Sequence, residues 1–583
     1  MEPIALENNP YHSMIEYVLQ AVSTIECKES RLMEYKMFNE NHIEFHDKTK
    51  LMILETRIYL MNFETRIYLM NFPVSSVDEY VELLLKKFCN SILYDRKYSF
   101  PMKYYIQYAI ILDIIPLHLL TTFSDEWIIN ETLKRKCSEL LFKRLAKCSM
   151  LKNLSLHQYP LDRWAIDSCC KMFKNFTHLT SLKIMPNRLT GSELSPYAYV
   201  IKPVAQYCHE LRELYLMYDG DTLRYMGPKI EDLVKCRKLV SLWLYDTGST
   251  APEDDVVDGL QTLLIELKDL KCLFHKYLKY AILNPNKKIS GTLGLEHLIL
   301  RDDVLLRRED EVELTTDELL RLCKICPATQ TLKLIKPPPC IDSVARALPN
   351  LKTLDLGRCG DDILPSLSRA LRHKNLMNLK VLKLREVFNM NYTHISQLAH
   401  RCPHLEVLDI SFATILADGD LTLPPGQSSA FPKLKELTMV PKCDKYHYNS
   451  ICWKDCQHSM WEVGEKLTRY LLKGSHNLES LHIHYTGSYY KPSSSFILKM
   501  LESLKCLTSF YLVSSLNMNI KIIREMVTRC PLLTELGAFG IWNWDTWTGQ
   551  DLLTQIKLKK NCKCSNVLNN FFYKKYSIEK RKR

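Results

Sequence analysis

A short leucine phrase that recurs along most of the chain constrains the fold more than any other feature. It reads Leu-x-x-Leu-x-Leu, as in Leu151-Lys-Asn-Leu154-Ser-Leu156. Consecutive copies often start 26 to 29 residues apart, and a fixed period in this range indicates a solenoid built from stacked repeats. Further copies, some with Ile, Phe or Met for a later leucine, start at Leu179, Leu211, Leu239, Leu295, Leu351, Leu379, Leu405, Leu434, Leu478 and Leu507, with looser ones at Thr329 and Leu533 and a worn one at Leu270.

Each repeat predicts a helix, a tight turn and a short strand. In the copy that begins at Leu405, Leu408 and Ile410 alternate with other residues, which is the period of a half-buried strand. The residues just before it carry apolar side chains at the i, i+3, i+4 and i+7 spacing of one helix face, namely Ile395, Leu398, Ala399 and Cys402. The same helical spacing precedes the copies at Thr329, Leu351 and Leu533.

One such unit cannot bury its own apolar face, whereas stacked units bury a continuous core. The pattern therefore predicts an α/β fold, a solenoid with a curved parallel sheet inside and helices outside. The phrase Cys402-Pro-His-Leu405-Glu-Val-Leu408 resembles that of F-box leucine-rich proteins, and the repeat as a whole is similar to the long class found in ribonuclease inhibitor. We expect leucine-rich repeats over 148–545, an α-helical N-terminal cap region over 1–147 and a basic C-terminal tail over 546–583.

Composition limits the possible locations and partners. The start of the chain has no basic region or apolar run typical of a secretory signal, so the 21 cysteines predict reduced thiols and a cytoplasmic or nuclear protein. The most apolar window, 104–123, contains Asp113 and His118, so we expect no membrane span. A net charge of +12 is moderate for 583 residues and does not by itself argue for nucleic acid. Six cysteines stand three residues before a phrase and predict small buried residues: Cys148, Cys208, Cys236, Cys326, Cys402 and Cys530.

The N-terminal region contains a candidate adaptor-binding box over 77–123. A Leu-x-x-x-Cys-x-x-x-Leu helix is formed by Leu85, Cys89 and Leu93, which resembles the elongin-binding box of VHL-box and SOCS-box receptors. About twenty residues later, a second pattern resembles the cullin-selecting box of the same receptors; it consists of Ile115, Pro116, Leu119 and Phe123. A box followed by leucine-rich repeats is similar to the Zyg/Zer receptors of cullin ligases. The resemblance implies elongin BC and a cullin as partners, bound through helix anchors in a groove.

Other interpretations of this region stay open. Ile115-Pro-Leu-His-Leu-Leu-x-x-Phe123 also opens like an F-box, which would imply a Skp-type adaptor. Thr132-Leu133-x-x-x-Cys137-x-x-x-Leu141 fits the elongin pattern as well. All three segments could instead be ordinary helices that cover the open end of the first repeat, since a solenoid requires such a cap.

The strand residues that point away from the leucines form the candidate binding surface. Because alternate strand residues face opposite sides, Tyr215, Met217, Trp243 and Tyr245 are predicted to lie side by side on neighbouring strands. Exposed aromatic side chains of this kind are typical of protein-binding hot spots. Alternatively, stacked side chains on neighbouring strands could simply cover one another from solvent. Farther along, basic residues alternate with Asp355 and Asp409, which favours a solvated face or a protein ligand over a phosphate track: Lys333, Lys383 and Arg385.

The sequence contains none of four common catalytic or cofactor motifs, namely Gly-x-Gly-x-x-Gly, the P-loop, His-Glu-x-x-His and Gly-x-Ser-x-Gly. The cysteines and histidines of 443–458 match no common zinc spacing, so we expect no metal, no cofactor and no enzymatic activity. The sequence favours a substrate-recognition subunit of a cullin-RING ubiquitin ligase that binds target proteins on its concave face. The alternative is a leucine-rich interaction scaffold or inhibitor with no ligase attached.

Overall fold

The computed structural model describes residues 74–93, 108, 111–112, 119–125, 131–157, 163–185, 199–218, 230–246, 254–284, 289, 291–300, 314–359, 362–387, 389–411, 415–416, 418–440, 465–484, 494–513, 525–526, 528–537 and 563–565. The chain divides into two compact units. The first comprises 1–284 with 304–307, and the second comprises 285–303 with 308–583.

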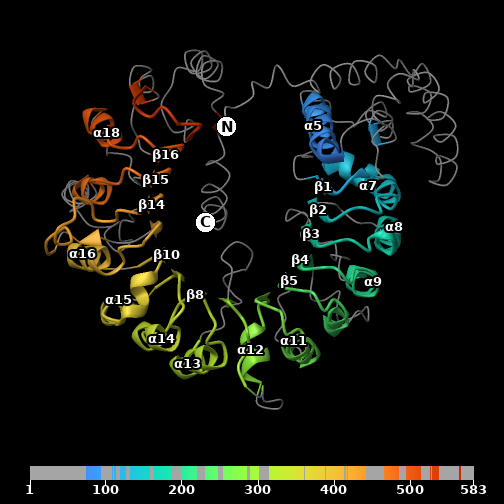
Figure 1. The fold of residues 1–583 in the computed structure, drawn as a ribbon, viewed down its shortest axis with the longest axis horizontal. Helices are drawn as coiled ribbons and strands as arrows, with labels where there is room; N and C mark the ends of the chain where they lie inside the picture. Colours follow the sequence, from blue (N-terminus) through green and yellow to red (C-terminus); the bar gives the residue numbers. More distant parts are fainter. Residues whose placement is uncertain are drawn as a thin grey trace, which may run out of the picture. The chain divides into compact units, whose positions relative to one another are not determined.

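The first unit contains a parallel sheet whose strands follow one another in chain order. Its strands are β1 (Thr122–Ser124), β2 (Asn153–His157), β3 (Ser181–Met185), β4 (Glu213–Tyr218), β5 (Ser241–Asp246) and β6 (Cys272–Phe274). Its helices are α5 (Val74–Leu93), α7 (Glu131–Leu145), α8 (Arg163–Met172), η3 (Phe173–Asn175), α9 (Ile201–Tyr207), η5 (Ile230–Lys235), α11 (Asp254–Glu266) and α12 (Leu278–Leu283). Figure 1 shows α7, α8, α9 and α11 along one side of these strands.

The second unit repeats the same plan. Its main sheet contains β7 (His297–Ile299), β8 (Thr331–Ile335), β9 (Thr353–Gly357), β10 (Val381–Arg385), β12 (Val407–Ser411), β14 (Glu436–Val440), β15 (Ser480–His484), β16 (Ser509–Val513), β17 (Glu535–Gly537) and β18 (Lys563–Ser565). A two-stranded sheet pairs β11 (Met390–Asn391) with β13 (Ile415–Leu416). The helices are α13 (Thr316–Ile325), α14 (Ile341–Ala347), α15 (Ile363–Ala370), η7 (Lys374–Asn378), α16 (Tyr392–Arg401) and α18 (Ser494–Leu501).

Within each unit the strands pair in register at the leucines of the repeated phrase. Leu354 of β9 lies opposite Leu332 of β8 on one side and Leu382 of β10 on the other. The predicted α/β leucine-rich repeat solenoid, with a parallel sheet on one side and helices on the other, is therefore confirmed. We call the side of each sheet that faces away from its helices the strand face (Figure 1).

A backbone ladder joins each repeat to the next. The carbonyl oxygen of the residue after the first leucine of a phrase accepts hydrogen bonds from two successive N–H groups of the following repeat. Thus the carbonyl oxygen of Lys352 accepts from Lys380 at 2.8 Å and from Val381 at 3.0 Å. The same pair of bonds recurs along both sheets, so each repeat supplies acceptors that its neighbour needs.

The core consists of the side chains that the phrase and the helix spacing predict. Leu354 and Leu356 of β9 are fully buried, and so are Val344 of α14 and Leu348, which follows that helix. All six cysteines predicted to be buried are inaccessible in the structure. At Cys208 the backbone turns from helix to strand: its N–H ends α9 by donating to the carbonyl of Val204 at 2.9 Å, and its carbonyl accepts from the N–H of Leu211 at 3.2 Å.

The looser copy of the phrase that starts at Thr329 is stabilised by a side-chain hydrogen bond. Thr329 stands where other repeats have leucine, and it is fully buried. Its hydroxyl donates to the carbonyl of Cys326 at 2.7 Å, which satisfies the polar atom that burial would otherwise penalise. Helix α13 of this repeat begins with a capping box between Thr315 and Glu318.

Two strands lie outside the range 148–545 in which the leucine phrases occur. Strand β1 begins the first sheet by pairing Phe123 with Leu154, and β18 ends the second by pairing Cys564 with Leu536. The segment Leu120-Thr-Thr-Phe123 is thus a degenerate phrase in which phenylalanine takes the place of the second leucine. Among the described residues, no helix is both long enough and apolar enough to cross a bilayer.

Candidate functional site

Four aromatic side chains meet on the strand face of the first unit. Parallel pairing places Tyr215 of β4 opposite Trp243 of β5, and Trp243 opposite Phe274 of β6. On β4, Leu214 and Leu216 point into the core and are 1% exposed, so the residue between them, Tyr215, faces the other side. We call Tyr215, Trp243, Tyr245 and Phe274 the aromatic ladder.

The rings of the aromatic ladder stack across the strands. The ring centroids of Tyr215 and Trp243 are 5.6 Å apart with an 11° angle between planes, and those of Trp243 and Phe274 are 5.3 Å apart. Tyr245 adds a fourth ring, 4.8 Å from that of Phe274. At one end, the Lys183 ammonium lies 5.0 Å from the centroid of Tyr215, within the range of a cation–π interaction. The stack is therefore a fixed array rather than a set of independent side chains.

Exposure divides the four residues predicted to bind a substrate into two pairs. Tyr215 and Trp243 are half-buried, whereas Met217 and Tyr245 are 4% and 9% exposed. The indole N–H of Trp243 donates to the hydroxyl of Ser241 at 3.0 Å, and burial raises the pKa of the Tyr215 phenol. A ligand could thus reach Tyr215 and Trp243, whereas Met217 and Tyr245 lie on the same face but are covered. Their role in binding stays a prediction.

The sequence analysis did not single out Phe274 or Lys183 as site residues. Phe274 belongs to the worn copy that starts at Leu270, and it occupies the same place in that copy as Trp243 does in the copy at Leu239. The signal was therefore present, since the fifth position of a recognised copy predicts the strand face. Lys183 occupies the same position in the copy at Leu179.

The predicted adaptor-binding residues lie on helix α5, in and near strand β1, and in a segment outside the described residues. Leu85 lies on α5 and is fully buried, as is its neighbour Leu84. Cys89 and Leu93 continue the same helix, but the structure does not describe their side chains, and Ile115 and Pro116 lie outside the described residues. Leu119 is half-buried, and Phe123 is a buried residue of strand β1 rather than of a helix. An adaptor site at these residues stays a prediction.

Helix α5 covers the first strand of the sheet. A stripe of buried side chains at helical spacing faces inward: Val77, Tyr80, Val81, Leu84 and Leu85. Asp78 completes the backbone ladder at this end. One of its carboxylate oxygens accepts from the N–H of Thr121 at 2.9 Å, and the other accepts from the Thr121 hydroxyl. In the later repeats of the first unit the equivalent N–H donates to a carbonyl of the preceding repeat, so at the first described strand Asp78 takes the place of that carbonyl.

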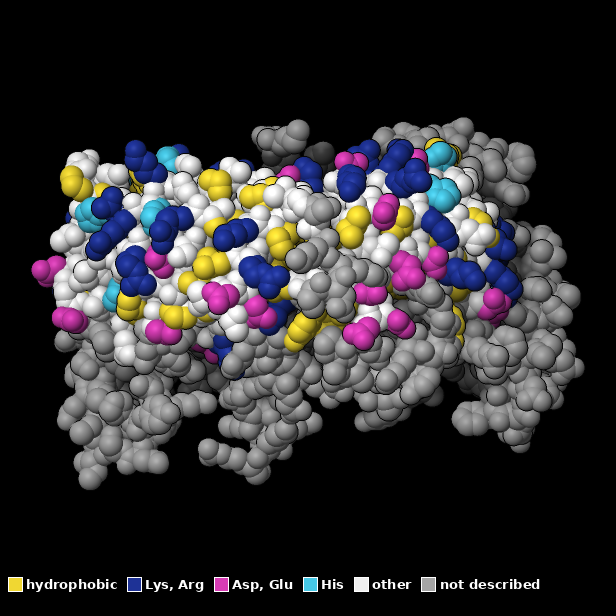
Figure 2. Space-filling view, turned by 90° about the horizontal axis from the view of Figure 1, so that it is seen from below, with side chains coloured by type: hydrophobic (Ala, Val, Ile, Leu, Met, Phe, Trp, Pro, Cys, Tyr) yellow, Lys and Arg dark blue, Asp and Glu magenta, His cyan; other side chains and the backbone are white. Residues whose placement is uncertain are grey.

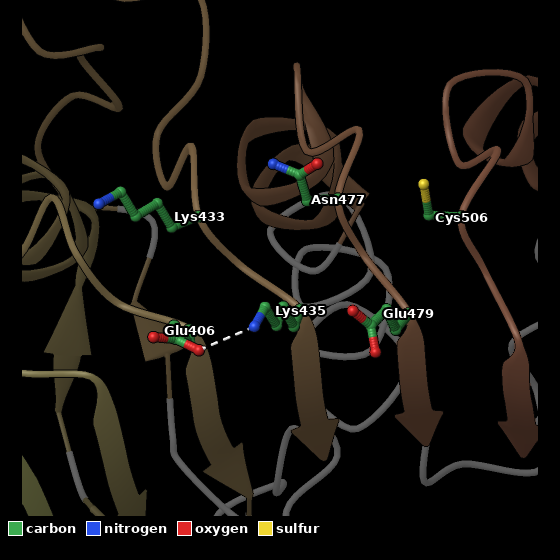
Figure 3. A pocket seen from close by; sticks show the side chains of 6 residues that line it. All are labelled: Glu406, Lys433, Lys435, Asn477, Glu479 and Cys506. Carbon is green, nitrogen blue, oxygen red and sulfur yellow. Dashed lines mark hydrogen bonds and ion pairs between the residues drawn. The ribbon is translucent and has the colours of Figure 1, made fainter.

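A charged pocket opens at the edge of the second sheet, where the chain enters its strands (Figure 3). It has a volume of about 260 Å³ and is lined by Glu406, Lys433, Lys435, Asn477, Glu479 and Cys506. Ion pairs with Lys380 at 2.9 Å and Lys435 at 3.0 Å lower the pKa of the Glu406 carboxyl. One ion pair, between Glu406 and Lys435, thus joins neighbouring repeats in the pocket wall, and we interpret the pocket as a solvated edge.

Potential metal ligands and exposed apolar side chains are scattered over the part of the chain that the structure describes. There, no cluster of three or more His, Cys, Asp or Glu side chains could hold a metal ion, and the Cys/His segment 443–458 lies outside it. Figure 2 shows basic and acidic side chains interspersed with small groups of hydrophobic ones. The large hydrophobic side chains exposed in the described ranges come from separate repeats: Met150, Ile265, Met377 and Leu532.

Comparisons with known proteins add little beyond the fold. No protein-family model matches the chain, and no curated protein sequence matches it. Among solved structures, the chain is similar to the complex of Rad7 and Elc1 from yeast, with a TM-score of 0.38 and 15% sequence identity; the match covers 67% of this chain and 97% of that one. At this level of similarity the match says nothing about function, so a function must be argued from the residues of this chain.

Proposed function

We propose that this protein is a substrate-recognition subunit of a cullin-RING ubiquitin ligase, which binds a target protein on its strand face and has no catalytic activity of its own. The observation that carries the proposal is the aromatic ladder, in which half-buried Tyr215 and Trp243 stack on a rigid parallel sheet. We expect the protein to act in the cytoplasm or the nucleus.

The aromatic ladder suits a protein ligand for two reasons. Tyrosine and tryptophan are enriched in binding hot spots because they offer a large contact area with few rotatable bonds. Here the rings are already fixed by stacking and by the Trp243–Ser241 hydrogen bond, so little side-chain entropy remains to be lost on binding. Lys183, over the ring of Tyr215, adds a charged group beside the apolar surface.

The ligase part of the proposal draws on Cys89 and Leu93, two of the three residues of the predicted elongin-binding pattern, which continue α5. Burial of Leu85 against the solenoid means that an adaptor could not use this residue as an anchor without displacing the helix. The adaptor contact would then depend on the later part of α5, which carries Cys89 and Leu93, and on the segment of Ile115 and Pro116.

A second candidate function is an interaction scaffold or inhibitor without a ligase. The buried stripe of α5 and the bonds from Asp78 to Thr121 favour it, because they are what a simple end cap requires. Under this alternative the strand face would still bind a protein, but α5 would contact only the chain's own first repeat.

An affinity purification separates the two candidates. Tagged full-length chain, its Cys89→Asp variant and a Cys506→Asp control in the second unit would be purified from cells and probed for elongins, Skp-type adaptor and cullins. The ligase proposal expects elongins and a cullin with the parent chain and the control, and their loss with Cys89→Asp. Retention of a Skp-type adaptor by all three proteins would indicate the F-box alternative. Absence of all these partners from every eluate would contradict the ligase proposal and leave the scaffold.

A further inference from the structure

The two accessible rings of the aromatic ladder have both of their faces covered. Strand β4 lies between β3 and β5, so the Tyr215 ring has Lys183 on one side and Trp243 on the other. The Lys183 ammonium is 5.0 Å from the Tyr215 centroid, and the Trp243 ring is 5.6 Å away. Trp243 in turn stacks between Tyr215 and Phe274. A ligand that reaches Tyr215 and Trp243 therefore meets ring edges rather than ring faces.

The covered faces disfavour two common ligands of exposed aromatic side chains. Nucleobases bind such side chains by stacking on an open face, and cationic groups such as methyl-lysine also lie over a ring face. Ring edges instead carry partial positive charge, so they attract oxygen atoms and the faces of other aromatic rings. The accessible part of the aromatic ladder therefore favours an apolar or aromatic side chain that comes with a negative group rather than a positive one.

Lys183 places a positive charge at the end of the aromatic ladder. Among the described residues no carboxylate forms an ion pair with it, and its interaction is the cation–π contact with Tyr215. Parallel register sets Lys183 between Ser155 of β2 and Tyr215 of β4, so its neighbours in the row are uncharged. Glu213, on the same face, accepts from the Ser181 hydroxyl at 3.0 Å. Because Lys183 is half-buried, a carboxylate that binds it is partly shielded from water.

We propose that the aromatic ladder recognises a segment of a target protein in which an Asp or Glu side chain stands about three residues from a large apolar side chain. The acid pairs with Lys183, and the apolar side chain packs on the edges of Tyr215 and Trp243. Lys183 of β3 and Trp243 of β5 are two strand spacings apart, roughly 10 Å, which matches two residues three apart in an extended segment. The inference rests on the proposed function, because it assumes that the aromatic ladder binds a target protein.

Selection from a random peptide library tests this chemistry without a known target. Full-length protein would select binders from phage-displayed random dodecapeptides, and the selected pool would be sequenced. Parallel selections would use Lys183→Glu, which reverses the charge at the aromatic ladder, and Lys202→Glu, a matched control that makes the same change on the exposed side of α9. Selected peptides would then be titrated against Trp243→Ala to separate binders of the aromatic ladder from binders of other surfaces.

We expect the parent chain and Lys202→Glu to enrich Asp or Glu three residues from Trp, Phe or Leu by about fivefold over the starting library. Lys183→Glu should lose this preference and enrich Lys or Arg at the same spacing, a reversal that an unfolded variant cannot imitate.

Three results would overturn the proposal. The first is an acid preference that Lys183→Glu leaves unchanged, or no acid preference at all. The second is a set of selected peptides that bind Trp243→Ala as tightly as the parent chain. The third is a labelled ten-nucleotide oligothymidylate that binds the parent chain but not Trp243→Ala, because base stacking requires the open ring faces that the ladder lacks.

The proposed function can fail separately from this inference. Selection of apolar residues that bind through Trp243, with no acid beside them, would keep the aromatic ladder as a target-binding surface and remove the role of Lys183. Absence of adaptors from the affinity purification, together with the expected acid preference, would remove the ligase and keep the acidic–apolar segment as the ligand of a scaffold.

Discussion

Replacement of Asp78 by alanine tests how the solenoid ends. The Asp78 carboxylate supplies both acceptors for Thr121, one for its N–H at 2.9 Å and one for its hydroxyl. In every later repeat of the first unit, the corresponding N–H finds a backbone carbonyl. Alanine would leave the first strand without this partner while keeping the apolar stripe of α5 intact.

The expected loss follows from the kind of bond that is removed. A hydrogen bond to a charged group contributes about 1.5–3 kcal/mol, and a part-buried N–H left without an acceptor adds a desolvation cost. We expect Asp78→Ala to lower the free energy of unfolding of the first unit by about 2 kcal/mol. Asp78→Asn keeps one acceptor oxygen, so it should lose about 1 kcal/mol.

Two measurements would follow these changes. Urea denaturation gives the loss of stability, and hydrogen exchange of the peptide that covers 119–125 reports whether the first strand opens more often. Repeat proteins lose their ends first because each repeat contacts only its neighbours, so exchange should rise most strongly at β1 and fall off toward β3.

The control for this prediction is Glu79→Ala, which removes a neighbouring exposed acid that faces away from the first strand. Its effect should stay within about 0.5 kcal/mol, with no change in exchange at β1. Equal stability and equal exchange for Asp78→Ala and Glu79→Ala would refute the idea that Asp78 takes the place of a preceding repeat's carbonyl.

Three other predictions concern the core. Burial lowers the pKa of His275 to about 3, so below about pH 6.5 the unfolded chain binds more protons than the native one. The free energy of unfolding should therefore fall by up to about 1.4 kcal/mol per pH unit as the pH drops toward 4. His275→Leu should reduce that slope in unfolding curves recorded at pH 7.0, 5.5 and 4.5. Burial raises the pKa of Cys326 to about 12, so iodoacetamide at pH 8 should label it in urea but not in native protein, as read by mass spectrometry of its peptide. Leu408→Ala should cost about 3 kcal/mol by urea denaturation, because this leucine is fully buried in β12; a loss below about 1 kcal/mol would contradict the packing.

Much of the fold could be predicted because the same pattern of buried leucines recurs in many repeats. Leu332, Leu354 and Leu382 share one place in the phrase, and that place sets which strand residues pair in register. The end of the sheet was harder to predict. Phe123 fills the place of a leucine, and its phrase has Asp125 where a third leucine would be expected. That aspartate is buried and accepts from the His157 N–H at 2.6 Å, a compensation visible only when the two strands are paired.

The candidate site was partly predictable for a related reason. Alternation along a strand predicts which side chains leave the core, so the positions of Tyr215 and Trp243 follow from the sequence. Alternation does not predict how deeply a side chain on that side is covered, because coverage depends on distant parts of the chain. Met217 and Tyr245 are consequently less accessible than the pattern alone suggests. The function of α5 as a cap depends on a contact from Asp78 to Thr121 across 43 residues of sequence, which no local pattern encodes.

Site-directed photo-crosslinking tests most directly whether the strand face is the surface that binds another protein. A benzophenone amino acid would replace Tyr215 in the aromatic ladder or Lys171 on the exposed outer side of α8. After irradiation in cells, we predict a discrete crosslinked protein from position 215 that disappears when Trp243 is changed to alanine, and none from position 171. The same crosslinks from both positions, or crosslinks from position 171 alone, would contradict the account.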